Sequence, residues 1–228
     1  MTGSSISPIS DSQAKAIEAT AKATEKAADV LSGLGGYLKE VFGTVPHDLV
    51  GYFGGDLLKI RRAENLRDIL ERSKERLEAR GVHETAPPSL SISLPIMVAA
   101  ADESRDELRD IWAGLLATAA DPASAIRFRN IFIDIAKKLD PLDASVLNQV
   151  LVLKHPLGAG SIFDSQKYDI SLRDTVGATA DEISVSLQNL RNLSLVNVQQ
   201  MLSPPTITAL GREFLRAVLD EWPDKLKR

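Results

Sequence analysis

The sequence predicts a mainly helical protein, in which an N-terminal helical domain precedes a winged-helix-like C-terminal module with a small β-hairpin. Apolar residues recur at helical spacing in several segments between residues 56 and 151. After residue 140 the patterns follow the order of a winged helix, with three helices, two short strands and a last helix. We therefore expect three parts: residues 1–32, an N-terminal helix; residues 33–140, the helical domain; and residues 141–228, the winged-helix-like module.

The helical domain is expected to open with a long amphipathic helix. Residues 56–80 carry leucine and isoleucine on one side and alternating charges on the other, and Gly81 is well placed to end the helix. Residues 83–94 follow as an expected extended linker, because Pro87 and Pro88 disfavour helical backbone before them.

Two further helices are expected in this domain. Asp102 or Ser104 can cap a helix that ends at Asp121-Pro122, and the apolar pattern then resumes over residues 126–139. Trp112 lies in the middle of the first apolar stripe, so it is predicted to be a core residue.

The C-terminal module shows strong local signals for its elements. Thr179 and Glu182 have the spacing of a capping box, and Pro204-Pro205 favours a turn between two strands. The expected elements are a helix that begins at Asp140-Pro141, a short helix over 170–176 ended by Gly177, the capped third helix, strands at 195–200 and 206–208, and a last helix over 209–221.

Composition narrows the class of protein. The chain has 228 residues, 44% of them hydrophobic and 25% charged, which is typical of a globular, helix-rich protein. It contains no cysteine, so it has no disulfide, thiolate metal site or thiol nucleophile. Residues 1–12 lack the features of a signal peptide, and the uncharged stretches 85–101 and 192–211 are interrupted by proline or polar residues. We expect a cytoplasmic protein.

Charge disfavours binding to nucleic acid. The formal net charge is −4, and residues 141–228 contain 9 basic against 10 acidic residues. The exposed positions expected on the third helix are Asp181, Glu182, Ser184, Ser186, Gln188, Asn189, Arg191 and Asn192, of which Arg191 alone is basic. Contact with a protein partner, or simple structural packing, is expected for this helix rather than DNA readout.

A second set of cations lies on the predicted helix over residues 56–80. Most of them alternate with acidic residues at spacings that allow i,i+3 and i,i+4 pairs, which indicates a solvated, salt-bridged face; Arg61 and Arg62 stand apart. The candidate interaction residues are therefore Arg61, Arg62, Gln188 and Arg191.

No residue pattern indicates an enzyme, a cofactor or a metal site. His47, His83 and His155 are scattered and lie beside no nucleophile motif, and the glycine clusters lack the Lys-Ser/Thr of a phosphate-binding loop. Asp102, Asp106 and Asp110 fall on one helix face, but acidic residues are common at helix N-termini because the helix dipole favours them. We predict neither catalytic nor metal-binding residues.

Residues 33–55 are rich in glycine and aromatic residues and leave two interpretations open. The segment is expected to be a buried hairpin, and the alternative is a segment that enters a membrane interface, where aromatic side chains partition well.

Four stretches resemble the abortive infection alpha family, which is also catalogued as a domain of unknown function. They are DIWAGLLATAADP at 110–122, FIDIAKKLDPLDA at 132–144, NLRDIL at 65–70 and TALGREF at 208–214. The resemblance covers most of residues 50–220, and it departs from the expected pattern at Gly114, where a small polar residue such as Asn is expected.

The resemblance implies a bacterial or phage-related protein linked to defence against bacteriophage, and it implies no catalytic residues. The leading expectation is a non-enzymatic defence protein that acts through protein contacts. The alternatives are a DNA-associated transcriptional regulator, which the winged-helix order suggests, and a membrane-perturbing effector that uses residues 33–55.

Overall fold

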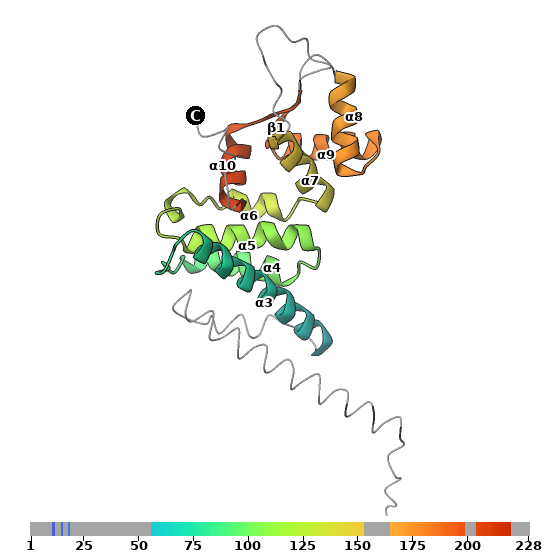
Figure 1. The fold of residues 1–228 in the computed structure, drawn as a ribbon. Helices are drawn as coiled ribbons and strands as arrows, with labels where there is room; N and C mark the ends of the chain where they lie inside the picture. The colour runs from blue at the N-terminus through green and yellow to red at the C-terminus, as the bar shows by residue number, and fades with distance from the viewer. Residues whose placement is uncertain are drawn as a thin grey trace, which may run out of the picture.

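The structure is a computed structural model that describes residues 56–152, 165–198 and 204–219, together with Asp11, Lys15 and Glu18. This part of the chain is mainly helical (Figure 1). Its elements are α3 (Asp56–Ala79), α4 (Leu90–Ala101), α5 (Asp106–Ala120), the 3-10 turn η1 (Ala125–Arg127), α6 (Ile131–Ala136), α7 (Pro141–Val152), α8 (Ser165–Val176), α9 (Ala180–Asn192), β1 (Val196–Asn197), β2 (Thr206–Ile207) and α10 (Ala209–Val218).

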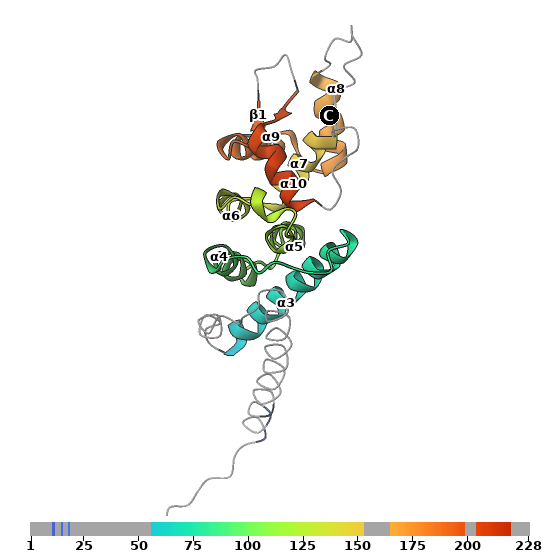
Figure 2. The same cartoon turned by 90° about the vertical axis from the view of Figure 1, so that its left-hand side faces the viewer.

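Helix α5 forms the centre of the fold. Every residue from Ile111 to Ala120 is buried, and α5 packs against α3, α4, α6 and α10. Figure 2 shows α5 with α3 and α4 on one side and α6 and α10 on the other. Trp112, 2% exposed, lies in this core as predicted. A helix that is apolar on all sides is stable only when neighbouring elements cover all of them.

The last helix reaches back to the centre through a close contact at Gly114. A Cβ atom at this position would lie 2.4 Å from the backbone oxygen of Val218, so only glycine allows α10 to come this near. The carbonyls that end α10 are satisfied from other helices: Thr118 donates to Ala217 at 2.7 Å, and Arg76 donates to Val218 at 2.6 Å. The departure from the expected family pattern at Gly114 therefore has a structural cause.

The elements of the C-terminal module follow the predicted order. The capping box of α9 is present, with the Thr179 amide donating to Glu182 at 2.8 Å and the Glu182 amide donating to the Thr179 hydroxyl at 3.3 Å. Strands β1 and β2 pair antiparallel over two residues each, so the hairpin is shorter than the predicted strands within the described residues. Gly81 and Gly177 follow α3 and α8 with φ of +71° and +69°, which confirms both predicted helix ends.

The predicted linker at 83–94 is wrong in its second half, because α4 begins at Leu90 and continues through Pro95. Proline removes one helical hydrogen bond, a cost of about 3 kcal/mol in a helix interior. Ile96 and Met97, both fully buried, pack between α3 and α5 and offset this loss. Burial therefore overrides the local proline signal.

Two predicted helix boundaries are also corrected. Neither Asp102 nor Ser104 caps α5, which begins at Asp106, because Asp102 ends α4 and the Glu103 carboxylate accepts the Arg105 amide at 2.9 Å. The predicted helix over 126–139 is split into η1 and α6 by extended backbone at Phe128, with φ −64° and ψ 135°.

Packing explains the break between η1 and α6. It places the rings of Phe128 and Phe132 edge to face, with centroids 5.9 Å apart, and both side chains are buried. In a continuous helix, the regular spacing of the helix alone would have fixed the relative positions of these two rings.

Some predictions lie outside the described residues. Asp11, Lys15 and Glu18 are helical and exposed, but the rest of residues 1–32 and all of residues 33–55 are not described. The division into three parts stays a prediction. Among the helices that are described, none has both the length and the apolar character needed to cross a membrane.

Candidate functional site

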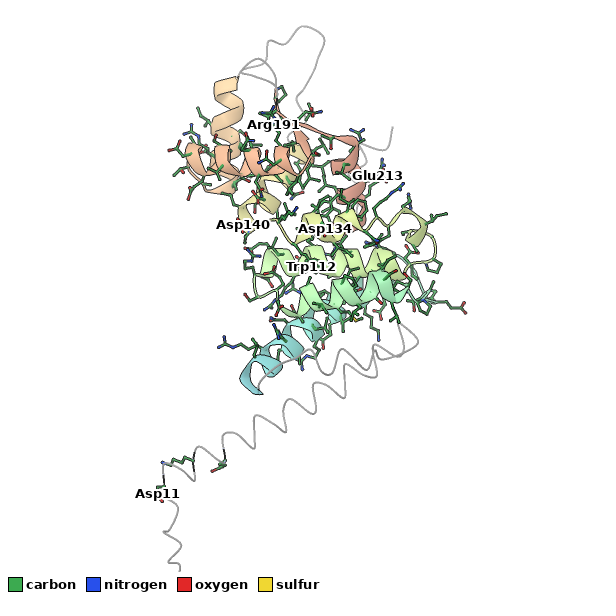
Figure 3. All side chains as sticks on the ribbon, turned by 180° about the vertical axis from the view of Figure 1, so that it is seen from behind. Asp11, Trp112, Asp134, Asp140, Arg191 and Glu213 are labelled. Carbon is green, nitrogen blue, oxygen red and sulfur yellow. The ribbon has the colours of Figure 1, made fainter. Side chains whose placement is uncertain are left out.

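The four candidate interaction residues divide into two groups. Arg61 is exposed on α3, and the Nε of Arg62 bonds to the Asp102 carboxylate at 2.5 Å, so Arg62 does not stand apart as predicted. Gln188 and Arg191 are exposed on α9, at the other end of the molecule from α3 (Figure 3). The structure does not bring the two groups together.

The cations of α3 form an ion-pair face with α5. Arg72 contacts Asp106 at 2.5 Å and Asp110 at 2.9 Å, and Arg109 of α5 contacts Asp68 of α3 at 3.3 Å. Burial alone would lower the pKa of Arg72, but the hydrogen bonds that it donates to Asp110 and Asp106 outweigh this effect and raise the pKa.

The predicted pairs within α3 are confirmed for Arg72 with Asp68 at 3.1 Å and for Arg67 with Glu71 at 3.6 Å. The pairs between α3 and α5 were missed, because sequence spacing reveals partners only within one helix. Asp106 and Asp110 thus serve as ion-pair partners of Arg72.

A groove of about 890 Å³ lies between the start of α7 and the exposed side of α9. We call it the acidic groove. Lys138, Asp140 and Leu142 line one side, and Asp181, Glu182, Val185 and Gln188 line the other. This groove includes Gln188 of the predicted interaction residues.

Asp143, 3% exposed, holds the two walls of the acidic groove together. Its carboxylate accepts the Asp140 amide at 2.9 Å, the Ser186 hydroxyl at 2.6 Å and the Asn189 side-chain amide at 2.7 Å. Ser186 is therefore buried and Asn189 half-buried, although both were expected to be exposed on the third helix. They are used to fasten α9 to α7.

The electrostatic character of the groove is negative. Four of its lining residues carry carboxylates and one, Lys138, carries an ammonium group. Hydrogen bonds from the Thr179 amide and hydroxyl lower the pKa of Glu182, so this carboxylate is ionised at neutral pH. Asp140 has an ion pair with Arg105 at 3.0 Å, but Arg105 is shared with the Glu103 carboxylate.

Two apolar side chains lie inside this negative rim. Val185 is 71% exposed, and Leu142, which is half-buried, lines the facing wall. Such a groove suits a cationic segment that also carries an aliphatic side chain. Two carboxylate pairs at the starts of adjacent helices, Asp140 with Asp143 and Asp181 with Glu182, are the sequence signal that identifies it.

The described residues contain no group of three or more histidine, cysteine, aspartate or glutamate side chains placed to hold a metal ion. His83 lines a second, open hollow of about 500 Å³ with Lys74, Glu78 and Glu84. The Ser186 hydroxyl and the Asp143 carboxylate both line the groove, but both residues are buried and their hydrogen bond joins α9 to α7.

A family model described as abortive infection alpha matches residues 61–208. The match spans the ion-pair face and the acidic groove and ends just before α10. No curated protein and no solved structure matches the chain.

Proposed function

The chain belongs to the abortive infection alpha family, and on this premise we propose that it is a non-enzymatic anti-phage defence protein that acts through protein contacts. The acidic groove is the proposed contact site. Its partner is a protein segment that carries positive charge and an aliphatic side chain. We place this activity in the cytoplasm.

One observation carries the proposal: a net negative groove surrounds Val185, which is 71% exposed. An apolar centre formed by Val185 and Leu142 inside a polar rim gives a partner apolar surface to cover, as in the core and rim of protein interfaces. The acidic rim adds selectivity, because it attracts a basic partner and repels an acidic one.

We further propose that α7 to α10 form a winged-helix-like module, which the order of three helices, a two-stranded hairpin and a helix supports. In a DNA-binding module of this kind, the N-terminal residues of the third helix approach the bases. In α9 these positions hold Asp181 and Glu182, which would repel phosphates. The charge of α9 thus favours a protein partner over duplex DNA.

The test is survival of bacteria that express the full chain, with and without phage challenge, together with a measurement of membrane potential. The groove variant Asp181→Lys/Ser184→Lys reverses charge at the rim. The matched control Asp174→Lys/Thr175→Lys makes the same changes on α8, outside the groove. Melting temperatures establish that both variants are folded.

We expect the wild type and the control to limit phage yield, and the groove variant to lose at least tenfold of this effect. If infected cells fare the same with and without the protein, the defence proposal is wrong. If the groove variant protects as well as the wild type, the contact lies elsewhere. Salt-dependent duplex binding that is lost in Arg191→Glu would instead support the DNA-associated alternative.

A further inference from the structure

A basic loop at residues 125–130 is the second unusual surface of the molecule. Ile126 is 89% exposed, more than any other large hydrophobic side chain that the structure describes. Arg127 and Arg129 on either side of Phe128 are exposed, and no ion pair or hydrogen bond joins their side chains to the described part of the chain. The loop presents an aliphatic side chain next to two unpaired cations.

The fold holds this loop in a defined conformation. The Asp121 carboxylate accepts the Ala123 amide at 2.8 Å and the Ser124 hydroxyl, and the Asp121 carbonyl accepts the Ala125 amide at 2.8 Å. Phe128 turns inward and packs on Phe132. A preformed loop loses less conformational entropy on binding than a flexible one.

The basic loop and the acidic groove are complementary in charge, and each presents an exposed aliphatic side chain. The loop offers two guanidinium groups beside one isoleucine. The groove offers Val185 with the Asp181 carboxylate and the exposed Asp140 carboxylate, which also pairs with Arg105. Exposed carboxylate and guanidinium groups can form bidentate pairs at such a contact.

The two surfaces lie at opposite ends of α6. The loop precedes Ile131, and the groove begins at Lys138, beyond a helix of six residues. At 1.5 Å per residue this helix separates them by about 9 Å along its axis alone. In Figure 3 the labelled Asp140 lies on one side of Asp134, and the turn that precedes α6 lies on the other. The loop and the groove of one chain therefore lie at opposite ends of α6.

We infer that the basic loop of one copy docks in the acidic groove of a second copy, so that the chain assembles head to tail. This inference rests on the proposed function and names the partner of the same groove. A contact between two different surfaces leaves one free groove and one free loop at the ends, so it continues into a ring or a filament. A one-loop contact buries little area, so assembly depends strongly on protein concentration.

The experiment measures the mass of the full chain by analytical ultracentrifugation, from low to high micromolar concentration. The loop variant is Arg127→Glu/Arg129→Glu, and the groove variant is Asp181→Lys/Ser184→Lys. The wild type is expected to form species larger than a dimer, which dissociate in about 0.5 M salt because screening weakens the charge pairs. Each variant alone stays monomeric.

A mixture of the two variants is the decisive sample. The groove variant keeps a normal loop and the loop variant keeps a normal groove, so the mixture regains an assembly that neither variant forms alone. Wild-type species larger than a dimer distinguish the head-to-tail contact from a symmetric one, which closes at two copies. Lys74→Glu on the outer face of α3 is the control and assembles as the wild type does.

The inference is overturned if the wild type is monomeric throughout, or if both variants assemble normally. Vesicles that contain phosphatidylglycerol provide a further arm. Binding of a monomer to them that is lost in the loop variant assigns the loop to anionic lipid instead. If the wild type is monomeric but the groove variant still loses phage protection, self-assembly is wrong and the proposed protein contact stands.

Discussion

Charge has different roles in two regions of the molecule. One region is the ion-pair face between α3 and α5, and the other comprises the acidic groove and the basic loop at the two ends of α6. On the ion-pair face, Arg72 and Arg109 each contact a carboxylate of the neighbouring helix within 3.3 Å. In the basic loop, Arg127 and Arg129 have no partner among the described residues. In the acidic groove, acidic side chains gather around Val185. Charges that are paired within the chain stabilise the fold, whereas the exposed side chains of Arg127, Arg129 and Asp181 remain free for a partner.

Helix geometry explains how the acidic groove can hold several carboxylates close together. Asp143 lies in the first turn of α7, and Asp181 and Glu182 lie in the first turn of α9. The partial positive charge at a helix N-terminus stabilises nearby carboxylates by roughly 0.3–1 kcal/mol each. Two adjacent N-termini can therefore hold a cluster of like charges that would otherwise repel one another.

The largest expected effect is that of Asp143→Ala, which removes the carboxylate that joins α7 to α9. The Ser186 hydroxyl would be left buried without its acceptor, and three hydrogen bonds to a charged group would be lost. We expect the free energy of unfolding in urea to fall by about 3 kcal/mol. Asp134→Ala, at an exposed site, is the control and should change it by under about 0.5 kcal/mol. Equal effects of the two changes would show that Asp143 does not hold the groove.

Gly114→Ala tests the close contact between α5 and α10, which joins the last helix to the core of the fold. Helix propensity alone predicts a gain of about 1 kcal/mol. The added Cβ would overlap the Val218 backbone, so we expect a net loss of about 2 kcal/mol and a less protected α10 in hydrogen exchange. A more stable variant would mean that α10 does not pack against α5 as described.

The pKa of Glu103 predicts how acid pH weakens the link between the α4–α5 turn and α7. Burial opposes ionisation of this side chain, but hydrogen bonds from Arg105 outweigh it, so the pKa of Glu103 lies below its ordinary value of 4.5. The folded state thus binds the proton more weakly than the unfolded state does, so ionised Glu103 adds to the free energy of unfolding. This contribution is complete above pH 4.5 and is lost as the pH falls through the lower pKa of the folded state.

Glu103→Gln should lower the free energy of unfolding by about 1–2 kcal/mol at neutral pH. It should also flatten the dependence of stability on pH below about 4.5. Denaturant melts between neutral pH and acid pH measure both effects. An unchanged slope in the acid range would assign the acid sensitivity to other carboxylates.

The smallest effect is expected for Arg72→Ala on the ion-pair face. Arg72 is partly exposed, so the free energy of unfolding should fall by about 1 kcal/mol at low salt and by less at high salt.

Arg127→Glu/Arg129→Glu in the basic loop should leave the melting temperature unchanged. If the loop variant is destabilised more than Arg72→Ala, the contrast between paired and free charges is wrong.

Local sequence signals predicted the elements that are specified by neighbouring residues. The capping box at Thr179 and Glu182 placed α9, and Gly81 placed the end of α3, because both are determined by hydrogen bonds and dihedral angles within one turn. They failed at α4, where proline and serine indicated a linker but burial between α3 and α5 imposes a helix. They failed again at Phe128, where ring packing breaks a periodic pattern.

The sequence by itself determined a mainly helical chain, its family and the absence of a nucleic-acid charge signature, because periodicity, motifs and net charge are local or additive properties. Tertiary structure decided which charges meet. Arg72 finds Asp106 and Asp110 because two helices pack, Ser186 turns inward to Asp143, and Arg127 finds no partner in the described chain. Pairing between segments depends on their relative placement, which no spacing along one segment contains.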